Sequence, residues 1–186
     1  MVEPDPRSDD ELVEAADLGD TAAFEELYYR YRDWVVRLAR RFAGNREDAL
    51  DVLQETFAYL LRKLPDLHLS ARMTSFLYPV VKHLSIAART KRQRYVTDDA
   101  LLRQQAARPM DGTKALRADL ADALAVLPEG QLEVVLMRFV DSMALQEIAD
   151  ALDIPLGTVK SRLHKALATL RTDARTRRYF GRQEKQ

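Results

Sequence analysis

Six polar side chains stand on one face of a predicted helix near the C-terminal end of the sequence. They lie within EIADALDIPLGTVKSRLHKAL, residues 147–167. Apolar residues recur every three or four positions there, so one stripe of the helix is buried and the polar residues lie opposite it. Lys and Arg neutralise phosphates, an Arg fork can bond a guanine edge, and Ser and Thr serve either purpose. The pattern therefore indicates contact with DNA through Thr158, Lys160, Ser161, Arg162, His164 and Lys165.

The element that would present these side chains is a helix-turn-helix. Ile148, Ala149 and Leu152 predict a first helix, and a turn follows at Asp153 and Ile154. A short turn between two steeply packed helices lets the second one protrude into a major groove. Many helical bundles contain a short turn and a basic helix without touching DNA, so a purely structural role is the alternative.

A second set of polar residues is acidic and lies in the stretch DALDVLQET. Asp48, Asp51 and Glu55 are spaced i, i+3 and i+7, which puts them on one helical face with Gln54 beside them. Such a face suits a basic partner surface, and the alternative is an ordinary solvated face. A metal site is disfavoured because no histidine joins the cluster.

Catalytic patterns are missing from the sequence. His68, His83 and His164 are far apart, and there is no cysteine, glycine-rich phosphate loop, HExxH or GxSxG motif. We therefore expect no enzyme activity, no metal and no cofactor. The lack of cysteine also fits a reducing compartment.

Charge is segregated along a chain whose formal net charge is zero. Acidic residues dominate 1–20 and 119–153, and basic residues dominate 60–95 and 154–186. Separate basic segments can meet a polyanion while the acidic ones face another partner. The N-terminus has no apolar signal segment, and no run of 18 apolar residues occurs. We expect a cytoplasmic protein without membrane insertion.

The periodicity is helical throughout and predicts an all-α protein of two small domains joined by a flexible linker. A short helix at Leu12–Ala16 precedes a long helix that begins near Asp20 or Thr21 and ends at Gly44–Asn45. The next helix stops before Pro65, the stretch PDLHLSA is a loop, and a further helix runs from about Arg72 to Arg94, with a bend expected at Pro79. The expected domains are 1–95 and 118–173, with a linker at 96–117 and a basic tail at 174–186.

The stretch LPEGQLEVVLMRFVDSMALQEIADALDIPLGTVKSRLHKALATLR resembles region 4 of bacterial RNA polymerase sigma factors, and EDALDVLQETFAYLLRKL resembles their region 2.2. The two segments follow in family order, with no bulky domain between them. This arrangement is similar to the extracytoplasmic-function (ECF) subfamily of the sigma-70 family. The resemblance covers roughly residues 10–95 and 118–172.

The resemblance implies a transcription initiation factor that binds core RNA polymerase, through its beta and beta-prime subunits, and directs it to promoters. The second domain would read the minus-35 element with its helix-turn-helix. The first would bind the polymerase and read the minus-10 element. The implied polymerase-binding residues are Asp48, Asp51, Gln54 and Glu55, and the implied minus-10 residues are His68, Phe76, Lys82, His83, Arg89, Lys91 and Arg92.

This sequence departs from the family pattern at several of these positions. Phe76, His83 and Ala87 stand where relatives commonly have Trp, Asn and Asp, and Pro155 replaces a usual Ser or Thr helix cap. Leu50 stands where relatives often have a further acid. Base reading at minus-10 would then depend on His83, which cannot reproduce the paired contact of an amide.

Two other functions stay open on the sequence: a stand-alone helix-turn-helix regulator that binds an operator, and a sigma-like protein that holds partners without initiating transcription. A lone regulator usually needs a dimer to read two half-sites, whereas this chain offers two different basic modules. We expect a monomer when free of partners, with an anti-sigma factor as a further partner. The promoter sequence and the inducing signal do not follow from the sequence.

Overall fold

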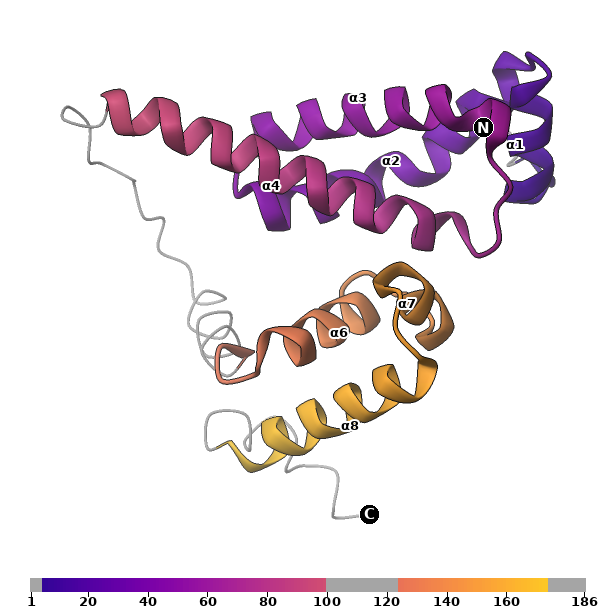
Figure 1. The fold of residues 1–186 in the computed structure, drawn as a ribbon. Coiled ribbons are helices and arrows are strands. Elements are labelled where there is room, and N and C mark those ends of the chain that lie inside the picture. Colours follow the sequence, from indigo (N-terminus) through magenta and orange to yellow (C-terminus); the bar gives the residue numbers. More distant parts are fainter. Residues whose placement is uncertain (1–4, 100–123, 174–186) are drawn as a thin grey trace. The chain divides into compact units, whose positions relative to one another are not determined.

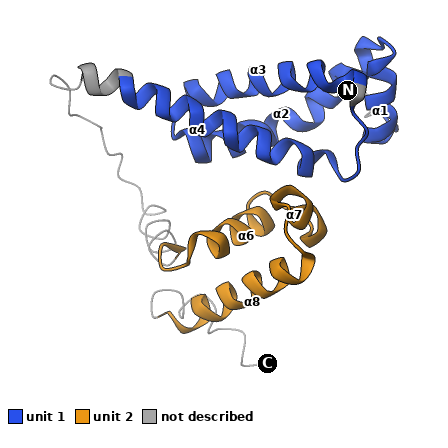
Figure 2. Cartoon of the chain, viewed as in Figure 1, with its two compact units in different colours: residues 1–103 blue, residues 104–186 orange. Residues whose placement is uncertain are grey.

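The computed structural model describes residues 5–99 and 124–173 of the 186-residue chain. Within these ranges the regular structure is entirely helical, which confirms the predicted all-α class. The chain divides into two compact units, Met1–Arg103 and Gln104–Gln186 (Figure 2). The division falls inside the stretch expected to be a linker. Most of that stretch and the expected basic tail lie outside the described residues.

The first unit is a helical bundle (Figure 1). Its helices are α1 (Asp9–Asp17), α2 (Thr21–Ala43), α3 (Arg46–Lys63) and α4 (Met73–Asp99). Helices α2, α3 and α4 pack on one another, and α1 packs on α2. Burying one apolar stripe from each helix forms the core. Its fully buried side chains include Leu12, Leu27, Val35, Leu38, Leu60, Met73, Leu77, Tyr78 and Val81.

Local hydrogen bonds set the starts of α1, α2 and α3, and the start of α2 near Asp20 is as the sequence predicts. Ser8 caps α1 in a capping box with Glu11, and the Asp20 carboxylate accepts from the first amides of α2. Gly44 ends α2 in the left-handed conformation, φ 84°, and Asn45 caps α3. Two residues therefore connect α2 to α3, and the predicted boundaries of both helices are confirmed.

Two predicted boundaries differ from the structure. Helix α4 continues to Asp99 rather than ending near Arg94, because the residues after Arg94 lose the apolar periodicity but include no Pro or Gly to stop a helix. The stretch PDLHLSA begins inside a single 3₁₀ turn, η1 (Leu64–Asp66), before it becomes irregular. Helix α4 includes Pro79, so a helix there is confirmed.

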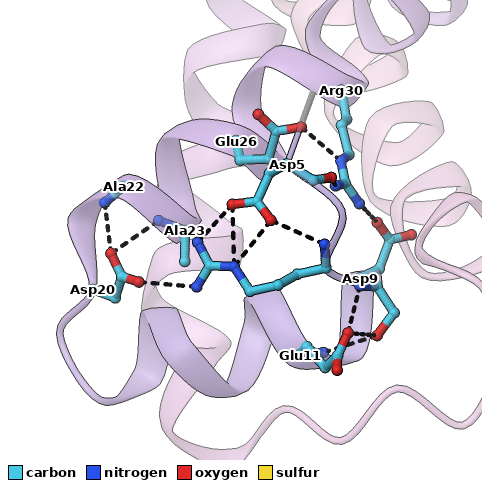
Figure 3. Close-up of polar contacts among 10 residues, drawn as sticks. Asp5, Asp9, Glu11, Asp20, Ala22, Ala23, Glu26 and Arg30 are labelled. Carbon is cyan, nitrogen blue, oxygen red and sulfur yellow. Dashed lines mark hydrogen bonds and ion pairs between the residues drawn. The ribbon is translucent and has the colours of Figure 1, made fainter. Parts of the chain in front are cut away.

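Charged residues tie the N-terminal segment to α1 and α2 (Figure 3). The Arg7 guanidinium donates to Asp5 at 2.7 Å and to Asp20 at 3.0 Å. Arg30 donates to Asp9 at 3.1 Å and to the backbone carbonyl of Asp5 at 2.6 Å. The hydrogen bonds from Arg7 lower the pKa of Asp5 to about 2. We call this set of residues the N-terminal charge network.

Tyr31 extends the N-terminal charge network toward the bundle interior. Its hydroxyl donates to the carboxylate of Asp9. Burial of the ring is the main cause that raises the pKa of Tyr31, and the hydrogen bond to Asp9 raises it further. Tyr31 is therefore a neutral donor whose hydrogen bond ties the Asp9 side chain of α1 to α2.

The second unit contains α6 (Glu129–Phe139), α7 (Leu145–Leu152) and α8 (Leu156–Thr172). Helix α8 packs on both α6 and α7. Asp153 forms the turn between α7 and α8 with a left-handed backbone, φ 51°, so the predicted turn is confirmed. Pro128 and Pro155 are the N-cap residues of α6 and α8. Part of the core is formed by Leu127, Val135, Ala166 and Leu170.

No helix within residues 5–99 and 124–173 is both long and apolar enough to cross a membrane.

Candidate nucleic-acid interface

Helix α8 separates its apolar and polar residues as its sequence predicts. Val159, Ala166 and Leu170 are buried, and Leu163 packs against the core. Among the six candidate residues, four are exposed and two, Thr158 and Arg162, are half-buried. A helix with one buried stripe presents its remaining side chains to solvent or to a partner. The exposed four are Lys160, Ser161, His164 and Lys165.

The six candidates divide into two groups on the surface of the unit. One group lines a hollow of about 470 Å³ between the N-terminal ends of α6 and α8. Its walls come from the starts of both helices, and two of its side chains are cationic. Lys160 and His164, four residues apart on α8, are not part of this lining. The residues that line the hollow are Pro128, Gly130, Gln131, Gly157, Thr158, Ser161, Arg162 and Lys165.

The side chain of Arg162 lies over the N-terminal turn of α6. A Cβ atom added to Gly130 would lie 3.2 Å from its Nη1. Within the described residues Arg162 makes no hydrogen bond or ion pair. A half-buried guanidinium whose donors are unused can bond phosphates or base edges without first losing an internal partner.

The first residues of α4 carry an aromatic stack. The rings of Phe76 and Tyr59 lie 6.2 Å apart between centroids at an interplanar angle of 30°, and Nζ of Lys63 lies 5.9 Å from the centroid of Tyr59. Tyr59 is half-buried, as is Phe76. Phe76 is thus held by a neighbouring ring and a nearby cation, which together form a surface on which a base can stack.

His83 and Arg89 lie exposed along α4. His83 follows Phe76 by seven residues, nearly two helical turns, so the two share one face. Lys82 is half-buried, with Nζ 5.9 Å from the centroid of the Phe42 ring. His68 is exposed in the loop before α4. Helix α4 therefore brings Phe76 and His83 together and leaves His68 on a separate segment.

The acidic residues of α3 have unequal surroundings. Asp51, Gln54 and Glu55 are exposed, whereas Asp48 is half-buried. Asp48 accepts from the side-chain amide of Asn45 at 2.5 Å, and its carboxylate lies 3.4 Å from Nε of Arg92. Asp48 is therefore occupied by contacts within the chain, and its three companions form the open part of the face.

Arg92 makes contacts with α2 and α3. Besides Asp48, its guanidinium reaches the backbone carbonyl of Ala43 at 3.4 Å. It thus lies against the end of α2 and the start of α3, a position that no sequence pattern predicts. Together with Lys91 and Ala88 it lines a hollow of about 500 Å³ that it shares with Asp48, Asp51, Gln54 and Glu55. Two predicted DNA contacts and four predicted polymerase contacts therefore border one surface.

Sequence reasoning missed Gly130, Gln131 and Tyr59. A glycine inside a predicted helix is less favourable than alanine. The presence of Gly130 in α6 could therefore have indicated that another side chain packs closely against it. Gln131, whose buried Oε1 has no hydrogen-bond partner, carried no such signal. Tyr59 could be found only by knowing that α3 and α4 pack side by side, since 17 positions separate it from Phe76.

The geometry defines a two-unit helical protein whose second unit is a helix-turn-helix with an open cationic face. Two sequence profiles match the same two parts of the chain: Sigma-70 region 2 over residues 27–95, and Sigma-70, region 4 over residues 123–172. The RNA polymerase sigma-E factor of Streptomyces coelicolor is 33% identical over 161 residues, which cover 84% of this chain and 88% of that protein. The ECF RNA polymerase sigma factor SigW of Bacillus subtilis is 26% identical over 171 residues, 84% of this chain and 91% of the relative. The chain belongs to the sigma-70 family of RNA polymerase sigma factors, in its ECF subfamily.

Solved structures share the fold. CnrH, in complex with the cytosolic domain of CnrY, aligns with a TM-score of 0.63 at 22% identity, over 87% of this chain and 94% of CnrH. The sigma factor RpoE, in complex with the anti-sigma factor NepR from Bartonella quintana, aligns with a TM-score of 0.55 at 19% identity, over 80% of this chain and 94% of RpoE.

Proposed function

We propose that this sigma factor reads the minus-35 element of its promoters with the exposed face of α8. The observation that carries the proposal is the cationic hollow between α6 and α8, in which Arg162 and Lys165 face solvent beside Thr158 and Ser161. An arginine fork supplies base discrimination, lysine neutralises phosphate, and the hydroxyls serve either purpose. Lys160 and His164 lie to one side of the hollow and are assigned to the flanking phosphates.

The minus-10 element is assigned to α4 and to the loop before it. Phe76, supported by Tyr59, supplies a stacking surface, and His83 on the same face supplies a polar contact to a base edge. Arg89 and Lys82 neutralise the backbone of the same strand, and His68 contributes from the loop. Binding of this kind depends strongly on salt, because cations condensed on the DNA are released.

The exposed acids of α3 are assigned to core polymerase, through its beta and beta-prime subunits. Asp51 and Glu55 lie four residues apart, without partners among the described residues, so both carboxylates are available to a basic surface. The factor then contributes promoter recognition, and the polymerase carries out RNA synthesis.

We further propose that the protein acts in the cytoplasm, is monomeric when free, and is held inactive by an anti-sigma factor, as RpoE of Bartonella quintana is bound by NepR.

The test uses the full chain with and without core polymerase. Run-off transcription from a library of genomic fragments reports activity and promoter sequence together. We expect transcripts only when both proteins are present, and retarded promoter DNA only in the presence of core. Equal retardation by the chain alone would favour a stand-alone regulator. Tight binding to core without any transcript would favour a partner-holding protein.

A further inference from the structure

Gly130 is the second residue of α6, and the side chain of Arg162 from α8 lies in the space that a side chain at position 130 would enter. A Cβ atom at position 130 would lie 3.2 Å from Nη1, 3.3 Å from Cζ and 3.7 Å from Nε of Arg162. The first two distances are shorter than the separation of about 3.5–4.0 Å that non-bonded heavy atoms prefer. The guanidinium therefore occupies space that any side chain at position 130 would take.

No polar contact within the described residues fixes the orientation of this guanidinium. Arg162 has no hydrogen bond and no ion pair among the described residues. An arginine side chain has many rotamers, and the orientation of its planar fork determines whether it can bond a base edge with two donors. Packing over the first turn of α6 is what selects one orientation here.

We propose that Gly130 is a positioning residue for minus-35 recognition: its missing side chain seats the Arg162 fork at the mouth of the hollow between α6 and α8. The inference rests on the proposed role of Arg162 in reading the minus-35 element. It gives a physical reason for a glycine where alanine would favour the helix more. Gly130 itself touches no base, and it acts only through Arg162.

The experiment replaces Gly130 with alanine in the full chain. The added methyl group meets the far end of a flexible side chain, so α6 stays folded and the guanidinium moves by a few tenths of an ångström. Holoenzyme containing Gly130→Ala is used to select promoter fragments randomised over the minus-35 element, and the bound fragments are sequenced. We expect the preference for the favoured base at one position to fall about threefold to tenfold, less than in Arg162→Ala. Thermal unfolding should show no loss of stability.

Gly157→Ala is the matched control. Gly157 is the second residue of α8 and lines the same hollow, but a Cβ there would meet no atom within 4 Å. Because a methyl group there cannot displace Arg162, this variant should not change the preference at the base position that Arg162→Ala affects, whatever direct contact with DNA it makes in the hollow. A second control adds Gly130→Ala to Arg162→Ala, where the glycine substitution should have no further effect because the fork is gone.

The outcomes separate the two proposals. If Arg162→Ala leaves the base preferences unchanged, the proposed role of Arg162 fails and the positioning role fails with it. If Arg162→Ala changes them while Gly130→Ala does not, only the role of Gly130 is overturned. The role of Gly130 is also overturned if Gly157→Ala produces the same change, or if Gly130→Ala still acts when Arg162 is absent.

Discussion

Arg7 and Arg30 in the first unit lie within hydrogen-bond distance of carboxylates, whereas Arg162 in the second unit lies where a side chain on Gly130 would meet it. In the N-terminal charge network each guanidinium bridges two segments of chain, from the N-terminal residues to α2. Among residues 5–99 and 124–173, none accepts a hydrogen bond from Arg162 of α8. Arginine therefore has a structural role in the N-terminal charge network and is available to a ligand on α8. Within the described residues, carboxylates lie next to the guanidinium groups in the first case and not in the second.

Arg92 falls between these two cases. It contacts Asp48 across 3.4 Å, yet 45% of its side-chain surface is exposed. Exposed ion pairs contribute roughly 0–1 kcal/mol to stability, so this contact is easily exchanged for another. Counting basic residues along a sequence therefore overstates the number available to DNA, and only the structure separates paired cations from unpaired ones.

The largest effect is expected where unpaired carboxylates meet a basic partner. Charge reversal in the double variant Asp51→Lys and Glu55→Lys should weaken binding to core polymerase about 100-fold or more, because like charges at a complementary interface cost several kcal/mol. The free energy of unfolding should change by no more than about 0.5 kcal/mol, because both side chains are exposed. Titration of labelled chain with core enzyme measures the binding. Reversal of the exposed pair Glu14 and Asp17 on α1 is the control, and equal weakening by both pairs would refute the assignment.

Arg162→Ala comes next. A base contact by an arginine fork contributes about 1–3 kcal/mol of discrimination, so affinity for the favoured minus-35 sequence should fall about 10-fold to 100-fold while core binding is unchanged. Lys160→Ala should weaken binding to all sequences alike and reduce the salt dependence by about one ion. Holoenzyme binding to promoter fragments at several salt concentrations distinguishes the two. A minus-35 footprint that stays intact in both variants would rule out this face of α8.

A smaller effect is expected from two arginines of α4, one exposed without an internal partner and one paired with a carboxylate. Arg89 is exposed and without an internal partner among the described residues, whereas Arg92 contacts Asp48. Arg89→Ala should reduce holoenzyme affinity for a forked minus-10 template by about threefold to tenfold and lower its salt dependence. Arg92→Ala should change this affinity by less than about twofold and strengthen core binding slightly, because it frees Asp48. Fluorescence anisotropy with the same template compares them, and equal losses would place Arg92 with the DNA contacts.

The smallest effect concerns acid stability. The pKa of Asp5 lies at about 2, below its ordinary value of 3.8, because Arg7 donates to its carboxylate. A lowered folded-state pKa stabilises the fold above pH 3.8, and this contribution is lost as the pH falls toward 2. Asp5→Asn should therefore lower Tm at pH 5, and its difference from the parent should vanish near pH 2. Arg7→Gln should remove the same pH dependence, whereas a constant difference across the range would show that Asp5 acts without its charge.

The parts of the structure that the sequence predicted are those decided by neighbouring residues. Asp20, Gly44 and Asn45 act on backbone within three or four positions, so caps and helix ends could be placed without knowing the packing. The polar face of α8 was likewise predictable, because one periodic stripe had to be buried. The family resemblance then identified which faces to compare.

The contacts that the sequence did not predict join residues far apart in the chain. Arg92 and Asp48 are separated by 44 positions, and Gly130 and Arg162 by 32. A local sequence pattern does not predict which side chains of two packed helices contact each other, because these contacts depend on the rotation of each helix about its axis. The end of α4 was misplaced for a different reason: loss of apolar periodicity marks the end of a buried stripe, not the end of a helix.

The two-residue connection Gly44–Asn45 also bears on how the chain folds. Helices α1, α2 and α3 each pack against the next helix in the sequence, so each meets a partner soon after it is formed. Contacts between neighbours in sequence require little loop closure, and domains rich in such contacts fold rapidly. On the ribosome, α2 and α3 can therefore pair before the second unit is synthesised. The acidic face of α3 would then be presented on a folded surface while α8 is still being made.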